Sequence, residues 1–228
     1  MVARKPGPTT PRRRQTAILI SGRGSNMSAL INAAADSSYP AKIALVLSSR
    51  TNAAGLDKAR EAGIECAAVD YAVGSGEAET AIAARLAEHG IELVCLAGFM
   101  RLLSAEFVER WHDRLINIHP SLLPAFPGLN THHRALNADV KVHGCTVHFV
   151  RAAMDSGPIV AQAAVPVLAG DTPDVLGARV LAAEHVLYPK ALALVAADRV
   201  RVVNELCVFS DKPSEGDGPA LLVSPPGI

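Results

Sequence analysis

The chain has 228 residues, of which 50% are hydrophobic and only 4% are aromatic. Its 22 basic residues balance its 22 acidic residues, so neither its net charge nor its few stacking side chains favour a nucleic acid or an anionic membrane as a partner. No apolar run approaches the roughly 20 residues that a membrane-spanning helix requires. Small molecules are therefore the expected partners.

Short apolar runs rich in β-branched residues alternate with longer Ala-rich segments along most of the chain. This pattern is typical of an α/β protein with a mostly parallel, twisted sheet that helices cover on both faces. Strands are predicted at residues 17–21, 42–48, around 67, 93–97 and 115–119. Helices are predicted between and after them, at residues 26–35, 53–62, 77–89, 104–111 and 131–137.

The last third of the chain has a different pattern. Residues 144–150 and 159–167 alternate between apolar and small or polar side chains, which predicts two strands joined by the loop 151–158. Asp171-Thr172-Pro173 then predicts the start of a helix that runs on towards Tyr188-Pro189. Because no repeat or linker interrupts residues 15–205, we expect them to form one domain.

The cysteines and the two ends of the chain are not expected to carry chemistry. The four cysteines lack paired CxxC spacing, which favours free thiols in a reducing cytoplasm over disulfides or a metal site: Cys66, Cys95, Cys145 and Cys207. Residues 1–14 are predicted to be a disordered basic extension without the apolar segment of a signal peptide, with a targeting or anion-binding role as the alternative. Residues 206–228 are predicted to form a loose tail.

A glycine-rich turn, Ser21-Gly22-Arg23-Gly24-Ser25-Asn26, follows the first predicted strand directly. The unpaired N–H groups at the start of the next helix, together with the helix dipole, make such a turn a site for an anion, most simply a phosphate. Neither the dinucleotide pattern nor the Walker pattern is complete, since Met27 holds the sixth position and no Gly-Lys-Ser/Thr follows. A tight turn with Ser25 or Asn26 as a helix cap remains the alternative.

A polar pair lies at the end of the fifth predicted strand. Asn117 and His119 are two residues apart, so a strand directs both side chains to one face, and Pro120 keeps His119 extended. An amide donor and an imidazole that titrates near neutrality suit acyl-group chemistry, and Asp155 is the carboxylate expected to orient the imidazole. Taken alone, His119 also fits a structural histidine, and Asp155 before Gly157-Pro158 also fits a turn.

The remaining histidines invite a metal hypothesis, which the sequence does not support. None of the following has zinc-type ligand spacing to another: His112, His119, His132, His133, His143 and His148. We therefore predict no metal. His148 is expected to be either a partner of the polar pair or strand surface, and His132 and His133 a solvated or pocket-rim pair.

Several short segments, taken together, resemble the folate-dependent phosphoribosylglycinamide formyltransferases. The resemblance runs from Ala17 to about Val203 and rests on these blocks: Ile20-Ser21-Gly22-x-Gly24-Ser25-Asn26, Leu96-Ala97-Gly98-Phe99-Met100-Arg101, Asn117-Ile118-His119-Pro120-Ser121-Leu122-Leu123-Pro124, Pro127-Gly128, Gly144-x-Thr146-Val147-His148-Phe149-Val150, Asp155-x-Gly157-Pro158-Ile159 and Glu184-His185-x-x-Tyr188-Pro189. It implies a Rossmann-like formyltransferase domain at residues 15–205. The implied reaction transfers a formyl group from 10-formyltetrahydrofolate to glycinamide ribonucleotide in de novo purine biosynthesis, in a monomer or homodimer.

The resemblance also implies a role for individual residues. The catalytic residues would be Asn117, His119 and Asp155. The residues that bind glycinamide ribonucleotide would be Gly24, Ser25, Asn26 and Glu184. The residues that bind the folate would be Met100, Arg101, Leu102, Leu103, Asn117, Val150 and Met154. The co-substrate is 10-formyltetrahydrofolate, and no metal is implied.

The chain departs from this family at one segment. Family members often carry an arginine of the folate site in the segment equivalent to Tyr71–Thr80, which here contains no Lys or Arg. Arg85 is the next candidate along the chain. The recognition of the folate tail is therefore open.

Three alternatives remain. A 10-formyltetrahydrofolate deformylase shares the His-Pro-Ser-Leu-Leu-Pro element but is expected to carry an additional N-terminal regulatory domain and to need no phosphate turn. A methionyl-tRNA formyltransferase is expected to carry a second, basic domain, for which the residues after 205 leave no room. A non-catalytic nucleotide- or folate-binding module has no need for Asn117, His119 and Asp155 together.

Overall fold

The computed structural model describes residues 12–210, and seven strands within them form one sheet. In chain order the strands are β1 (Arg14–Ile20), β2 (Ala41–Ser48), β3 (Glu65–Ala68), β4 (Leu93–Leu96), β5 (Leu115–His119), β6 (Val142–Phe149) and β7 (Ile159–Pro166). Their order in the sheet is β3-β2-β1-β4-β5-β6-β7, with β1 to β5 parallel and β6 and β7 antiparallel. The strand order reverses between β1 and β4, where open α/β sheets bind ligands beyond the carboxyl ends of their strands.

Helices cover both faces of this sheet. They are α1 (Ser25–Ala34), α2 (Ala54–Glu61), α3 (Ser75–Glu88), α4 (Ala105–Arg110), α5 (Thr131–Asn137) and α6 (Pro173–Ala196). Alternation along β1 divides the core into two clusters: Ile18 and Ile20 pack with residues of α1, α2, α5 and α6, whereas Ala17 and Leu19 pack with residues of α3 and α4. The α/β prediction, with a mostly parallel sheet covered on both faces, is confirmed.

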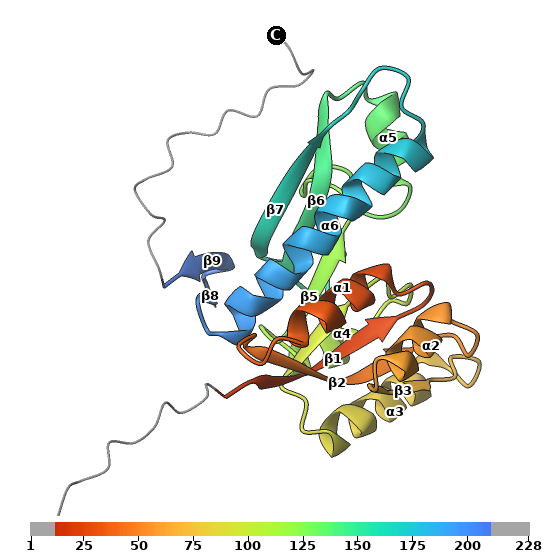
Figure 1. Cartoon of the computed structure of the whole chain (residues 1–228), viewed down its shortest axis with the longest axis vertical. Helices are drawn as coiled ribbons and strands as arrows, with labels where there is room; N and C mark the ends of the chain where they lie inside the picture. Colours follow the sequence, from red (N-terminus) through yellow and green to blue (C-terminus); the bar gives the residue numbers. More distant parts are fainter. Residues whose placement is uncertain (1–11, 211–228) are drawn as a thin grey trace, which may run out of the picture.

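Helix α6 crosses the sheet diagonally beside α1 (Figure 1). It begins as predicted, because the Thr172 hydroxyl accepts a hydrogen bond from the Val175 N–H and Pro173 occupies the first turn. It continues past Pro189 to Ala196, further than expected, because the following turns bury Ala191, Leu192 and Val195. The Tyr188 hydroxyl is buried under the sheet, 3.0 Å from the Leu96 carbonyl oxygen and 3.1 Å from that of Ile116.

The predicted tail begins too early, because a hairpin follows α6. Strands β8 (Val200–Val203) and β9 (Leu206–Phe209) pair with one another, joined by Asn204 and Glu205. Both joining residues have positive φ, at 51° and 58°, as a tight hairpin turn requires. Val200 is buried, and Val202 and Cys207 pack against the main core. Residues 206–209 therefore belong to the folded part of the chain.

The rest of the predicted tail, residues 211–228, and residues 1–11 of the predicted extension lie outside the described residues. Arg14, the last residue of that extension, is the first residue of β1. The four cysteines are free, as expected. Among the helices of residues 12–210, none is long and apolar enough to cross a membrane.

Candidate active site

Asn117, His119 and Asp155 come together at the carboxyl end of β5. Strand β5 directs Asn117 and His119 to the same face, as the sequence predicts. The His119 Nδ1 atom lies 3.4 Å from a carboxylate oxygen of Asp155, and the His119 Nε2 atom lies 3.1 Å from the Phe126 carbonyl oxygen. A carbonyl only accepts, so Nε2 carries a hydrogen. The protonated imidazole then has a hydrogen-bond acceptor at both nitrogens.

His148 is a partner of this group and not strand surface. It is buried on β6, opposite Asn117, with its Nδ1 atom 3.0 Å from the Phe149 carbonyl oxygen. Burial lowers the pKa of His148, which favours the neutral ring. With its hydrogen on Nδ1, the ring accepts at Nε2 from the Asn117 amide nitrogen, at 3.2 Å. This bond orients the amide and leaves its second N–H free for a ligand.

Asp155 is held by its loop in an unusual backbone conformation. Its φ is 51°, and its carboxylate accepts a hydrogen bond of 2.7 Å from the Gly128 N–H. The Phe149 N–H donates to the Pro158 carbonyl at 2.9 Å and closes the base of the loop. A Cβ atom at Gly157 would lie only 1.7 Å from the Phe149 carbonyl oxygen, so this close approach requires glycine.

The predicted phosphate turn has the geometry of an anion site. Gly24 is the residue before α1, with φ of 68° and no side-chain cap, so neither Ser25 nor Asn26 caps the helix. The first helical bond runs from the Ser28 N–H to the Gly24 carbonyl, which leaves the N–H groups of the preceding turn without a helical acceptor. A Cβ atom at Gly24 would lie 2.9 Å from the Gly55 Cα, so α2 packs directly against the turn.

Asn26 and Glu184 meet beneath this turn. The Asn26 Nδ2 atom donates to the Glu184 carboxylate at 2.7 Å, and both side chains are buried. Burial raises the pKa of Glu184, while the bond from Asn26 opposes this effect. The Asn26 Oδ1 atom is buried without a partner among residues 12–210. A ligand with an O–H or N–H group would satisfy it.

The apolar residues predicted to bind the folate, here called the apolar rim, come from the loop after β4, the end of β6 and the loop that carries Asp155. Met100, Leu102 and Met154 expose large apolar side chains, at 64%, 75% and 58% of their full area, whereas Leu103 and Val150 pack on the core. The Met100 N–H donates to the Ser21 hydroxyl at 2.8 Å, so the loop after β4 is bonded to the start of the turn. The two predicted ligand-binding segments are therefore neighbours.

The segment Tyr71–Thr80 braces that loop. Glu79, buried on α3, accepts a hydrogen bond of 2.7 Å from the Ser104 N–H and another from its hydroxyl. The Tyr71 ring contacts the Phe99 ring edge-on at 6.1 Å, and the Arg101 guanidinium lies over it at 5.0 Å. The segment that lacks the arginine thus holds both ends of the loop from Phe99 to Ser104.

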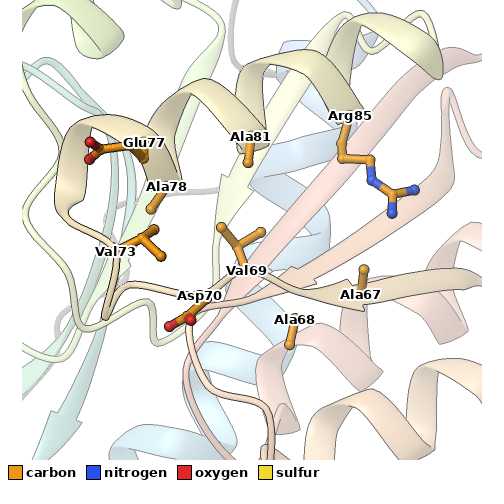
Figure 2. Close-up of a pocket in the computed structure, with 9 residues that line it drawn as sticks. All are labelled: Ala67, Ala68, Val69, Asp70, Val73, Glu77, Ala78, Ala81 and Arg85. Carbon is orange, nitrogen blue, oxygen red and sulfur yellow. The ribbon is translucent and has the colours of Figure 1, made fainter.

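Arg85 does not lie on this rim. It lines a separate cavity of about 250 Å³ between the end of β3 and helix α3, where Val69 and Ala78 point inwards (Figure 2). Its guanidinium is 3.7 Å from the Glu65 carboxylate. A second cavity of about 320 Å³ adjoins the loop after β4, and Arg50 and Arg101 are its basic lining residues.

Sequence reasoning missed the main-chain partners of the site and several supporting side chains. These are the Phe126 carbonyl, the Gly128 N–H, Ser49, Gly55 and Tyr71. Ser49 shares a hydrogen bond of 2.6 Å with Ser21. Pro127-Gly128, one of the blocks of the family resemblance, was the only sequence signal for these main-chain partners.

The remaining histidines of the described residues do not form a metal site. His132 lies against His143, with 3.2 Å between their ring nitrogens. Among residues 12–210, no group of three or more His, Cys, Asp or Glu side chains is arranged to hold a metal ion.

Comparison with known proteins identifies the family of the chain. The sequence model of the formyl transferase family matches residues 14–192. Phosphoribosylglycinamide formyltransferase from Escherichia coli is 42% identical over 187 residues, covering 81% of this chain and 88% of that protein. The crystal structure of glycinamide ribonucleotide transformylase 1 from Symbiobacterium toebii superposes with a TM-score of 0.85 at 44% identity, covering 87% of this chain and 95% of that one.

A longer relative matches the same region. The trifunctional purine biosynthetic protein adenosine-3 from Bos taurus is 48% identical over 194 residues, which are 84% of this chain and 19% of that protein. The chain thus spans about a fifth of the length of this relative. The matched region contains the turn, the polar group on β5 and the loop that carries Asp155. The chain therefore belongs to the formyl transferase family, within its group of phosphoribosylglycinamide formyltransferases.

Proposed function

We propose that this protein transfers the formyl group of 10-formyltetrahydrofolate to the amine of glycinamide ribonucleotide, a step of de novo purine biosynthesis. One observation carries the proposal: Asn117, bonded to His148, lies with the His119–Asp155 pair at the end of β5, beside strands that lead into the anion turn and the loop of Met100. The reaction needs a phosphate site, a surface for a flat ring and a group that moves protons. The turn after β1, the loop of Met100 to Leu103 after β4 and the polar group on β5 follow strands that are neighbours in the sheet, which supports the proposal.

The ribonucleotide binds at the turn and beneath it. The N–H groups of Gly24, Ser25 and Asn26 hold the phosphate at the start of α1, where the helix dipole adds to the attraction. Glu184 accepts a hydrogen bond from the sugar or the glycinamide. The unpartnered Asn26 Oδ1 supports this proposal, because it is an acceptor in a buried position that a ligand donor would satisfy.

The folate binds across the apolar rim. Met100, Leu102 and Leu103 cover one face of the pterin, and Val150 and Met154 close the other. The exposure of Met100, Leu102 and Met154 supports this proposal, since exposed apolar side chains near a polar site mark a ligand surface. Main-chain groups of the loop from Met100 to Leu103 recognise the ring edge.

The folate tail carries carboxylates and leaves the rim towards the second cavity. We propose that Arg101 and Arg50 bind it in place of the arginine that is absent from residues 71–80. The stacking of Arg101 on Tyr71 supports this proposal, because a guanidinium held over a ring needs little reordering to pair with a carboxylate.

The reaction begins when the substrate amine attacks the formyl carbon and negative charge develops on the formyl oxygen. The free N–H of Asn117 donates to this oxygen, and one such donor is typically worth about 10²–10³ in rate. The protonated His119 donates as well once its Nε2–H exchanges the Phe126 carbonyl for this oxygen. The Asp155 carboxylate, 3.4 Å from His119 Nδ1, fixes the plane of the ring. The bond between the formyl carbon and the folate nitrogen then breaks as His119 gives its proton to that nitrogen, and His119 takes up a proton from the attacking nitrogen, directly or through water. No covalent enzyme intermediate forms.

A formyl-transfer assay tests the proposal. The protein is mixed with 10-formyltetrahydrofolate, with and without glycinamide ribonucleotide, and both tetrahydrofolate release and the formylated product are measured. Folate release that requires the ribonucleotide supports the transferase. Release without it would identify a deformylase, and binding without turnover would identify a non-catalytic module.

The proposal also covers the cellular compartment and the oligomeric state. The four free cysteines suit the reducing cytoplasm. The protein acts as a monomer or homodimer on small-molecule substrates, without nucleic acid or membrane as a partner. Analytical ultracentrifugation at working concentration decides between the two oligomeric states.

A further inference from the structure

Arg151, which has no role in the proposed binding or catalysis, links three separate parts of the chain. Arg151 follows Val150 at the start of the loop that carries Asp155. Its guanidinium donates to the Asp113 carboxylate at 2.7 Å and to the two carboxylate oxygens of Glu205 at 2.7 and 3.3 Å. Asp113 lies before β5, and Glu205 is in the turn of the β8–β9 hairpin.

The position of Arg151 sets it apart from an ordinary surface ion pair. Only 14% of its side chain is exposed, and two carboxylates engage its guanidinium, one of them through both oxygens. Two-oxygen arginine–carboxylate contacts in a network hold geometry far better than single exposed pairs. The Arg151 Cγ atom also lies 3.2 Å from where a Gly157 Cβ would be, so its stem touches the returning limb of the loop.

The loop between these limbs has few other attachments. Ala152, Ala153, Met154 and Ser156 are all exposed, so apolar packing does little to order it. Asp155 ties its tip to the Gly128 N–H, and Arg151 ties its base to Asp113 and Glu205. Without the Arg151 pairs, the loop is held at its base only by the Phe149–Pro158 main-chain hydrogen bond and at its tip by the contacts of Asp155 with Gly128, His119 and His148.

We propose that Arg151 is a positioning residue, which holds the loop 151–157 closed over the folate through its pairs with Glu205 and Asp113. The β8–β9 hairpin thereby influences an affinity for a ligand that it does not touch. The effect falls on folate binding more than on the chemical step, because Asp155 retains its own bond to Gly128. This inference rests on the proposed function only in naming the folate as the ligand.

Three variants and one control test it. Arg151→Met keeps the length of the side chain without its charge, Glu205→Gln removes the charge from the hairpin, and the double variant removes both. Glu106→Gln is the matched control, since it removes an exposed ion pair with Arg110 on helix α4. Steady-state kinetics with each substrate varied in turn, and hydrogen exchange of the free protein, are measured on all of them.

Arg151→Met is expected to raise the KM for 10-formyltetrahydrofolate by about three- to tenfold, the equivalent of one half-buried ion pair. The ribonucleotide KM stays near the wild-type value and kcat changes less than the folate KM. Glu205→Gln gives a smaller change in the same direction, and the double variant resembles Arg151→Met alone, because the two residues act through one contact. Amides of residues 151–157 exchange faster in all three variants and not in Glu106→Gln.

The inference is overturned if the variants lower only the thermal midpoint while the folate KM and the loop exchange rates stay at wild-type values. Additive effects in the double variant would also overturn it. A wild-type protein that shows no formyl transfer contradicts the proposed function instead, and in that case the exchange rates of residues 151–157 still decide whether Arg151 holds the loop.

Discussion

At the scale of single residues, the polar group on β5 depends on main-chain atoms as much as on side chains. The Phe126 carbonyl accepts from His119, and the Gly128 N–H donates to Asp155, so the chain between them orients both members of the pair. His148 orients Asn117 in the same way from the neighbouring strand. Each proposed catalytic side chain is thus held by a partner that does not need to touch a substrate.

Substitution of His119 is the most direct test of the proposed mechanism. His119→Ala removes a proton carrier and one donor to the developing oxyanion, so kcat is expected to fall by at least about 10²–10⁴-fold. The affinities for both substrates stay nearly unchanged, because these interactions strengthen only as charge develops. Rapid-quench kinetics and calorimetry measure the two effects separately. A variant with near-wild-type kcat would show that His119 is a structural histidine.

Asp155→Asn tests the charge of the Asp155 side chain separately from its size. The amide keeps the size of the side chain but removes the negative charge that lies 3.4 Å from His119 Nδ1, so kcat is expected to fall. Steady-state kinetics and hydrogen exchange of residues 151–157 are measured on the wild type and the variant. If the rate falls while the loop amides exchange faster, Asp155 acts through the loop geometry and not through its charge.

At the scale of elements, the start of α1 is built against the start of α2. Glycine at positions 24 and 55 allows their main chains to touch, and the Gly55 N–H donates to the Gly22 carbonyl at 3.0 Å. The turn is therefore fixed in shape before any anion arrives. Its N–H groups need no reordering on binding, which favours affinity.

Gly24→Val tests this packing. A branched side chain at φ of 68° is strained, and its Cβ would lie 2.9 Å from the Gly55 Cα, so the turn must open. Ribonucleotide affinity is expected to fall by about tenfold or more, while folate affinity changes little. Gly76→Val is the control, because a Cβ there meets nothing within 4 Å. Calorimetry measures the affinity of the variant for each ligand. An equal loss of affinity for both ligands would show that the turn has only a structural role.

Much of the fold could be predicted from sequence, and the misses have a common cause. Strands β1, β2 and β4 contain continuous apolar runs, and Ser104 and Thr172 act as the helix caps that their positions suggest. Asn117 and His119 share a face because strand periodicity is local information. The hairpin of β8 and β9 was missed because its two strands have four residues each and gain stability only by packing on the finished core. The pairs of Arg151 were missed for the same reason, since Glu205 lies far along the chain.

At the scale of the whole molecule, buried histidines link stability to pH. His143 is almost fully buried, and burial, with His132 and His119 nearby, lowers its pKa to about 4 from an ordinary value of 6.5. Burial lowers the pKa of His148 as well. As the pH falls below 6.5, the unfolded chain binds these protons and the folded chain does not. Both neutral rings therefore contribute fully to the free energy of unfolding above pH 6.5. This contribution is lost progressively as the pH falls below 6.5.

The free energy of unfolding is accordingly expected to fall by about 1–3 kcal/mol between pH 6.5 and 4 on account of His143. Urea denaturation of the wild type and of His143→Asn across this range measures the difference in slope. His112→Asn, at an exposed position, serves as the control. A His143 variant that loses stability as steeply as the wild type would contradict the assignment of this acid sensitivity to the buried ring.

The Tyr188 hydroxyl touches the sheet at the last residues where β4 and β5 pair. Beyond this point one strand leads into the loop of Met100 and the other into the loop after His119, so the tyrosine lies where the two proposed ligand-binding segments diverge. Their spacing is therefore set from beneath by a helix that belongs to neither. Grafting Asn117, His119 and Asp155 onto another parallel sheet would transfer the reactive groups without this spacing. A graft of the proposed active site would therefore need to include helix α6.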